Sequence, residues 1–332
     1  MGSPRDYKNT IVPNWCPGCG DFGIQNAIAA VCAAKGWPNE DIVLISGIGC
    51  SSRIGGYQYC YGAHTTHGRA LPFAQGIKCA NKDIHMIVCS GDGDSYAIGL
   101  GHALHAMKRN MDITYIVFDN QVYGLTKGQT SPMSSKGFVT KTTPDGNPLT
   151  PLDAPSMALA AGATFVAQAY AIDMKNMMDV ITKAVDHKGF SYVNIFTPCV
   201  TFNQFNTVEW YNGHLKKLAD VRENYDPHDK AAAFHLLSDT DSLVLGVIYE
   251  EEGAVPFGEI VPSADVRLAD HVEKPAAALL KISVWNFGKI VLRRRFSASG
   301  IKKTFINQIL RFKQQLLEIA GLSRSVKGAF AS

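Results

Sequence analysis

The first two hundred residues alternate between short apolar runs and longer segments whose apolar positions recur at helical spacing. The short runs predict strands at 42–46, 84–89, 113–118, 164–166 and 192–196. The longer segments predict helices at 22–34, 69–79, 95–108, 156–161 and 174–187. Strands that alternate with helices are typical of an α/β fold with a doubly wound, mostly parallel sheet. In such folds, ligands bind at the carboxyl ends of the strands.

Two polar segments, 90–94 and 119–124, directly follow two of these predicted strands. They place Asp92 and Asn120 at the same edge of a parallel sheet. Oxygen ligands of this kind suit Mg²⁺, which usually binds one or two carboxylates together with substrate phosphates. The glycines beside Asp92 let the backbone approach a phosphate, and the helix predicted from Ser95 points its N-terminal dipole toward it. Gly-Asp-Gly alone is equally typical of an ordinary turn.

A Cys-x-x-Cys pair, Cys16 and Cys19, lies just before the first predicted helix. Taken alone, the pair is compatible with a zinc site, a redox dithiol or half of an iron–sulfur site. A redox dithiol of the thioredoxin type would follow a strand, and none is predicted here. The tight turn at Pro17-Gly18 favours paired ligands over two unligated cysteines.

Two more cysteines follow predicted strands and can reach the same edge. Cys50 comes after the strand at 42–46, and Cys199 comes after the strand at 192–196. The topology can therefore bring Cys16, Cys19, Cys50 and Cys199 together. Of the other four cysteines, we expect Cys32, Cys79 and Cys89 to be packing residues. The fourth, Cys60, lies in a tyrosine-rich loop.

The segment 64–69 carries two histidines and an arginine. His64 and His67 could both bind a metal, but no carboxylate lies beside them. We favour His67 and Arg69 as hydrogen-bond donors to a diphosphate, for which Gly68 leaves room. The alternative is a solvated polar loop.

A long segment rich in Gly, Ser, Thr and Pro runs from about residue 123 to 151, and loops of this length are usually functional. It contains Lys127, which could pair with an anionic substrate or with coenzyme A. A single lysine in a loop is more often simply solvated.

The composition is that of a globular protein with a sizeable core: 332 residues, 46% hydrophobic and 18% charged. This length allows one large α/β domain with an extension, or two domains. No run of about 18 uninterrupted apolar residues is present, so we expect no membrane span. The start of the chain lacks an apolar signal core, and eight cysteines in such a chain favour free thiols in the cytoplasm.

Six segments, taken in order, carry a resemblance to a known family. They are Trp-Cys-Pro-Gly-Cys-Gly-Asp-Phe-Gly (15–23), Gly-Ile-Gly-Cys-Ser-Ser-Arg (47–53), His-Gly-Arg-Ala-Leu-Pro-Phe-Ala (67–74), Gly-Asp-Gly-Asp (91–94), Asp-Asn-Gln-Val-Tyr-Gly-Leu-Thr-Lys-Gly-Gln (119–129) and Thr-Pro-Cys-Val-Thr-Phe-Asn (197–203). Together they closely resemble the β subunit of 2-oxoacid:ferredoxin oxidoreductases, nearest to the 2-oxoglutarate branch, over roughly residues 12–290. Gly-Asp-Gly followed by this Asn resembles the thiamine diphosphate (TPP) signature.

The resemblance implies a TPP-binding fold and a set of site residues. It implies that Mg²⁺ is held by Asp92, Asn120 and the carbonyl of Val122, and that one 4Fe–4S cluster is held by Cys16, Cys19, Cys50 and Cys199. It implies that TPP is lined by Ile48, Gly49, Cys50, Ser51, Thr66, His67, Gly68, Arg69, Gly93, Asp94, Gly124 and Leu125. His67 and Lys127 would be catalytic, with Lys127 facing the substrate or coenzyme A. The family usually has a hydrophobic residue where Thr66 stands, a difference that concerns loop packing.

The resemblance also implies that the chain has three parts. Residues 1–210 would bind TPP and the cluster, and residues 211–280 would form a C-terminal extension of the family fold. Residues 281–332 would form a tail outside the family pattern. The tail contains eleven Lys and Arg and one acid, so its net charge is +10 and the rest of the chain carries −7. Apolar positions at 301–320 predict an amphipathic helix. We expect its apolar side to dock on protein and its cationic side to attract an acidic electron acceptor.

The implied reaction is the coenzyme A-dependent oxidative decarboxylation of a 2-oxoacid, most simply 2-oxoglutarate to succinyl-CoA and CO₂. Electrons would pass through the cluster to ferredoxin, and the reverse reaction would fix CO₂. The chain would be active only with its α subunit, as αβ or (αβ)₂. A non-redox TPP decarboxylase or ligase is the alternative enzyme, but it would not need four cysteines at the ligand edge. A zinc-stabilised nucleic-acid-binding protein would have no use for Asp92 and Asn120, so we expect no nucleic-acid partner.

Overall fold

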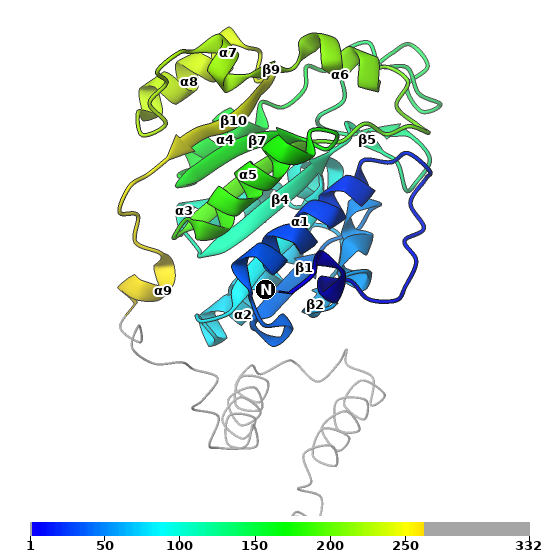
Figure 1. Ribbon diagram of the computed structural model, residues 1–332. Helices are drawn as coiled ribbons and strands as arrows, with labels where there is room; N and C mark the ends of the chain where they lie inside the picture. The colour runs from blue at the N-terminus through cyan, green and yellow to red at the C-terminus, as the bar shows by residue number, and fades with distance from the viewer. Residues whose placement is uncertain (1, 262–332) are drawn as a thin grey trace, which may run out of the picture. The chain divides into compact units, whose positions relative to one another are not determined.

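Eight strands form one sheet in the computed structural model, in which residues 2–261 are described (Figure 1). Their order is β2-β1-β3-β4-β8-β7-β10-β9. Their bounds are β1 (Ile42–Ser46), β2 (Tyr61–His64), β3 (His85–Gly91), β4 (Ile113–Asp119), β7 (Phe165–Tyr170), β8 (Phe190–Phe196), β9 (Lys216–Lys217) and β10 (Val244–Glu250). The first six strands of this order are parallel, and β10 is antiparallel to β7. The structure therefore confirms the mostly parallel α/β sheet and all five predicted strands, of which 164–166 is the start of the longer β7.

Helices cover both faces of the sheet, and each face has its own apolar core. Helices α1 (Asp21–Lys35) and α5 (Met174–Asp186) lie side by side on one face (Figure 1). The other face is covered by α2 (Ala70–Ala80), α3 (Leu100–Lys108), α4 (Ala154–Ala161) and α8 (Lys230–Asp239). Strand β4 is therefore buried on both of its faces. Tyr115 and Val117 pack in one core, and Ile116 and Phe118 pack in the other. A strand buried on both faces is a continuous apolar run, which is why the sequence pattern located it.

The shorter elements lie in the connections. They are α6 (Val208–His214), α7 (Leu218–Val221), α9 (Phe257–Ile260), a hairpin of β5 (Val122–Tyr123) with β6 (Gln129–Thr130), and the 3₁₀ turns η1 (Pro4–Tyr7), η2 (Asn39–Asp41) and η3 (Ser51–Gly56). The β5–β6 hairpin lies inside the long segment that the sequence predicted as a loop. No helix among residues 2–261 is long and apolar enough to cross a membrane.

The helix predicted at 95–108 is present, but it consists of two pieces. A π-helical turn, η4 (Asp94–Ile98), comes first, and α3 begins after Gly99. A Cβ atom on Gly99 would lie 2.4 Å from the carbonyl oxygen of Asp94. The turn therefore packs against itself too closely for any side chain at that position. This irregular turn lies directly beside Asp92, at the carboxyl edge of the sheet.

Three strands of this sheet escaped prediction: β2, β9 and β10. Strand β2 is an edge strand with mostly exposed side chains, so it has no buried apolar pattern. Strand β10 lies after residue 210, where the sequence analysis assigned an extension without elements; β10 and β9 continue the same sheet. The tail at 281–332 and its predicted helix at 301–320 lie outside the described residues.

Candidate functional site

The carboxyl ends of β3 and β4 bring Asp92 and Asn120 to adjacent loops. The two strands pair in register, with Gly91 opposite Phe118, so each residue follows the end of its own strand. Asp92 is buried, and the Ser131 hydroxyl donates a hydrogen bond to its Oδ2. The backbone N–H of Val122 donates to Oδ1 of Asn120 over 3.1 Å. The three predicted Mg²⁺ ligands thus lie at one place, which is the edge that the sequence predicted.

The electrostatics of this edge fit a cation. Burial raises the pKa of Asp92 to about 7, although the hydrogen bond from Ser131 opposes the shift. Burial and the charge of Asp92 raise the pKa of the neighbouring Asp119 well above its usual value, and Oδ1 of Asp119 has no hydrogen-bond partner. Two buried carboxyl groups this close favour a bound cation or a proton. Within residues 2–261, no group of three or more His, Cys, Asp and Glu side chains is arranged so that it could hold a metal ion. Only one of the predicted Mg²⁺ ligands, Asp92, is such a side chain, and the Mg²⁺ site stays a prediction.

Four cysteines meet beside this edge, around a cavity of about 260 Å³. Its lining includes Cys16, Cys19, Cys50 and Cys199. The first two precede α1, Cys50 follows β1, and Cys199 follows β8. A Cβ atom on Gly124 would lie 3.6 Å from the sulfurs of both Cys50 and Cys199. Each thiolate of a four-iron cluster binds a different iron, so its sulfurs need not surround a single point as zinc ligands do.

The donor set is chemically suited to an iron–sulfur cluster, which stays a prediction. Burial, followed by the charge of Asp21, raises the pKa of Cys19; the same two causes, in the same order, raise the pKa of Cys50 to about 11. These thiols are therefore protonated at neutral pH in the metal-free chain. Asp21 itself is buried, and burial raises its pKa to about 7, although an interaction with the Cys19 thiol opposes the shift. Metal binding would release the thiol protons.

Asp94 ties together the loops that carry the predicted TPP contacts. Its carboxylate accepts hydrogen bonds from the backbone N–H groups of Ile48 over 3.2 Å and Gly68 over 2.7 Å, and from the Ser90 hydroxyl. Its Oδ1 also lies against Nδ1 of His67. Because Nδ1 of His67 faces the carboxylate, Nε2 is the ring nitrogen that can form a hydrogen bond with a ligand.

The remaining predicted TPP contacts lie in the loops at the same edge of the sheet. Arg69 donates to the carbonyl oxygens of Gly68 and Ile98, each over 3.2 Å. The other predicted TPP residues occupy the loops after β1, before α2, after β3 and after β4: Gly49 and Ser51, Thr66, Gly93, and Gly124 with Leu125. Their TPP contacts, like the role of Arg69 toward a diphosphate, stay predictions.

Lys127 lines the cysteine cavity together with Asn120, Gly124 and Leu125. Its backbone has a φ of +77°, a left-handed conformation, and its N–H donates to the carbonyl of Gly124 over 3.0 Å. This tight turn places an exposed lysine beside both the cysteines and a predicted Mg²⁺ ligand.

Sequence reasoning missed two residues of this edge. Ser131 contacts Asp92 from the middle of the long loop, and nothing in the sequence links two residues so far apart. Asp21 lies next to the Cys-x-x-Cys pair, at the start of α1, where it is buried. The sequence shows that this acid is near the cysteines, but only the fold shows that it is buried.

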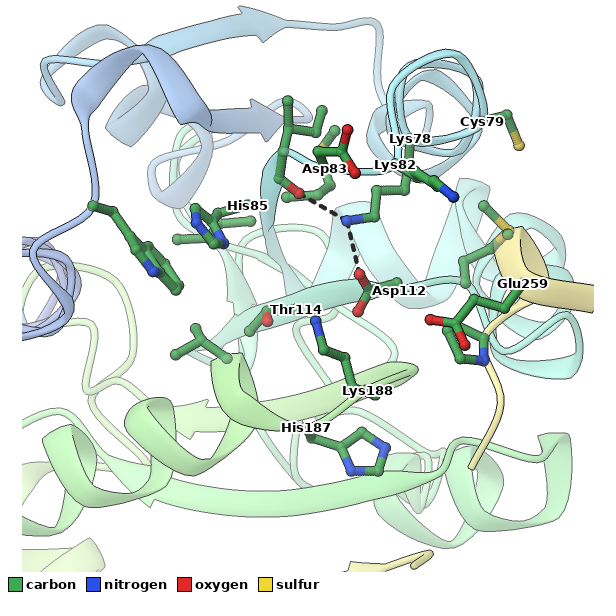
Figure 2. Close-up of a pocket in the computed structure, with 18 residues that line it drawn as sticks. Lys78, Cys79, Lys82, Asp83, His85, Asp112, Thr114, His187, Lys188 and Glu259 are labelled. Atoms are coloured by element: carbon green, nitrogen blue, oxygen red, sulfur yellow. Dashed lines mark hydrogen bonds and ion pairs between the residues drawn. The ribbon is translucent and has the colours of Figure 1, made fainter. Parts of the chain in front are cut away.

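A larger cavity of about 450 Å³ lies at the opposite edge of the sheet, where β3 and β4 begin (Figure 2). Figure 2 shows Lys78 reaching Asp112 and the carbonyl of Ile84, over 2.7 Å in each case. The ring of His85 stacks on Trp37. The cations here are balanced by acids, and doubly wound folds bind their ligands at the other edge. We therefore place the chemistry at the smaller cavity.

Comparisons with known proteins agree with this geometry. Residues 47–195 match the model for the C-terminal TPP-binding domain of thiamine pyrophosphate enzymes, and residues 199–265 match that for the C-terminal part of the pyruvate ferredoxin oxidoreductase β subunit. The chain is 39% identical over 280 residues to a 2-oxoacid:ferredoxin oxidoreductase subunit β from Sulfolobus sp., covering 81% of this chain and 91% of that protein. It is 41% identical to the 2-oxoglutarate synthase subunit KorB of Archaeoglobus fulgidus, covering 66% and 82% respectively. A solved 2-oxoglutarate:ferredoxin oxidoreductase from Magnetococcus marinus, with 2-oxoglutarate, coenzyme A and succinyl-CoA bound, superposes with a TM-score of 0.77 at 38% identity, covering 85% of this chain and 96% of that one.

Proposed function

The chain belongs to the family of 2-oxoacid:ferredoxin oxidoreductase β subunits, and we propose that it carries TPP, Mg²⁺ and one 4Fe–4S cluster in an enzyme acting on 2-oxoglutarate. The reaction converts 2-oxoglutarate and coenzyme A to succinyl-CoA and CO₂, and it passes two electrons singly to ferredoxin. The names of the relatives and the ligands of the solved structure support this choice of 2-oxoacid.

The observation that carries this proposal is the shared cavity. The four cysteines line the same space as Asn120 and Gly124, which follow the end of β4. A cofactor held at Asn120 therefore lies beside the proposed electron acceptor. A non-redox TPP enzyme has no use for four thiols in that place.

The protein's own residues bind and orient. Asp92, Asn120 and the Val122 carbonyl would hold Mg²⁺ next to the diphosphate-binding loops. Asp94 fixes the turns at Ile48 and Gly68 in these loops. When bound, TPP supplies the electron sink for decarboxylation of the 2-oxoacid. His67, whose Nδ1 lies against Asp94, presents Nε2 as a hydrogen-bonding group.

The cysteines would serve electron transfer, and Lys127 would serve substrate binding. Four thiolate ligands permit a cluster of low potential, which suits electron transfer to ferredoxin. Lys127 is an exposed cation in the same space, where it would meet a substrate carboxylate or a phosphate of coenzyme A. All eight cysteines lie within the described residues and none forms a disulfide. This suits a reducing compartment such as the cytoplasm.

The test is to co-express the chain with its α subunit, purify the complex anaerobically, and assay ferredoxin reduction with a panel of 2-oxoacids. We expect the largest kcat/KM with 2-oxoglutarate and no turnover without coenzyme A or without the α subunit. Preference for another 2-oxoacid would overturn the substrate assignment. Decarboxylation with no ferredoxin reduction, by a colourless protein, would instead indicate the non-redox alternative.

A further inference from the structure

A serine turn in the long loop contacts both loops of the proposed Mg²⁺ site. The Ser131 hydroxyl donates to Oδ2 of Asp92, and the Ser134 hydroxyl donates to the carbonyl of Gln121 over 2.6 Å. Gln121 lies between Asn120 and Val122 in the chain, so the second contact falls within the other ligand segment. The two serines also bind each other, since the Ser131 N–H donates to Oγ of Ser134 over 2.8 Å.

Ser131 is well placed to orient a carboxylate. Its side chain is buried, and its Oγ accepts a hydrogen bond from the Met133 N–H over 3.3 Å. That contact leaves the single hydroxyl proton for Asp92. A carboxylate with one oxygen engaged in this way has a restricted orientation and keeps its other oxygen for a metal ion. Outer partners of this kind orient metal ligands and commonly change metal affinity 10–100-fold, as an order of magnitude.

The same turn fixes the loop that reaches the cysteine cavity. The Asn147 side chain donates to the carbonyl of Ser134 over 2.8 Å, which ties the far part of the loop to the turn. The near part of the loop carries Gly124, Leu125 and Lys127, all of which line the cavity. The Ser131 hydroxyl group therefore links the position of this loop to the orientation of the Asp92 carboxylate.

We propose that Ser131 is a positioning residue that latches the 124–151 loop to Asp92, so that Mg²⁺ binding and the ordering of this loop support each other. This inference rests on the proposed Mg²⁺ role of Asp92. It predicts that loss of the hydroxyl weakens Mg²⁺ binding and loosens the loop, without removing any ligand.

The first measurement is a Mg²⁺ titration of TPP binding to the αβ complex by calorimetry. Ser131→Ala should need about 10–100-fold more Mg²⁺ than the wild type and recover full TPP binding at saturating Mg²⁺. Ser131→Thr, which keeps the hydroxyl, should behave as the wild type. The matched control is Ser135→Ala in the same loop, whose Oγ contacts Asn206 and the side chain of Gln121 and no proposed ligand.

The second measurement follows the loop by limited trypsin digestion at the exposed Lys136 and Lys141. Mg²⁺ with TPP should slow cleavage in the wild type and in Ser131→Thr, and should slow it less in Ser131→Ala at the same Mg²⁺ concentration. Ser131→Cys, which keeps the volume but weakens the donor, provides the same test if the alanine variant does not assemble. Wild-type Mg²⁺ dependence and wild-type cleavage in the variants that lack the hydroxyl would overturn the latch. A wild-type complex that binds TPP without Mg²⁺ would instead overturn the proposed Mg²⁺ site.

Discussion

The sulfur atoms of Cys50 and Cys199 both lie next to Gly124: a Cβ atom at Gly124 would stand 3.6 Å from each sulfur. The same Cβ would lie 4.0 Å from Nδ2 of Asn120. Gly124 is thus the point where the cysteine group and the proposed Mg²⁺ site meet. The two centres are neighbours because β1, β4 and β8 end at the same edge of the sheet.

We expect side-chain size at Gly124 to control both centres. Gly124→Ala adds a Cβ at ordinary contact distance and should retain cluster iron and TPP binding. Gly124→Leu would push its branched end toward the sulfurs and should lose at least half of the iron. Iron analysis and calorimetry on the αβ complex measure both effects, and full iron in the leucine variant would contradict the contact.

Cys199→Ser should lose most of the cluster iron and the ferredoxin-coupled activity, because serine is a poor ligand for a low-potential cluster. Cys32→Ala is the matched control. Cys32 lies on the buried side of α1, away from the lining of the cysteine cavity, and its variant should keep both iron and activity. Iron and sulfide analysis after anaerobic purification checks this, and a Cys199 variant with its full iron content would reject the ligand role.

Asp92→Ala should abolish TPP binding while leaving the visible spectrum of the cluster intact. The carboxylate is a proposed metal ligand, whereas the cysteines are held by other loops. Asp179→Ala, on the exposed side of α5 with Lys183 as its partner, is the control and should bind TPP normally. Calorimetry with TPP and Mg²⁺ gives the answer, and unchanged affinity in the Asp92 variant would exclude it as a ligand.

A pH dependence of stability follows from His187. Its pKa is lowered mainly by burial, although the charge of Glu250 opposes the shift, and its Nε2 lies 2.8 Å from the Thr164 hydroxyl. The folded state therefore binds this proton less readily than the unfolded state, and stability falls as pH drops below about 6.5, the unfolded pKa. His187→Gln should flatten the decline in melting temperature of the αβ complex between pH 7 and pH 5. An identical decline in both proteins would remove His187 from the explanation.

The basic tail yields a kinetic prediction from its charge alone. Deletion of 300–332 should leave 2-oxoacid turnover with a small-molecule dye unchanged. It should raise the KM for ferredoxin at low ionic strength, because long-range attraction acts on association and is screened by salt. If the ferredoxin KM and its salt dependence match the full-length complex, the electrostatic role is wrong.

The sequence was informative where burial leaves a pattern. Strands such as β4 are apolar on both faces, so their ends, and with them Asp92, Asn120 and Cys199, could be placed at one edge. The edge strand β2 is exposed and leaves no such pattern. The break at Gly99 and the contact from Ser131 to Asp92 depend on how distant segments pack, which no local pattern encodes. The same is true of Asp21, whose isolation from water comes from tertiary packing.

The most direct test of the account is to follow the visible and paramagnetic spectra of the anaerobic αβ complex when substrate is added without ferredoxin. We expect 2-oxoglutarate with coenzyme A to bleach the visible absorption and produce the signal of one reduced 4Fe–4S cluster per chain. Asp92→Ala, with its cluster iron still present, should show neither change. A wild-type complex that decarboxylates 2-oxoglutarate while its cluster stays oxidised, or that contains no cluster, would contradict the claim that cofactor and cluster share one site.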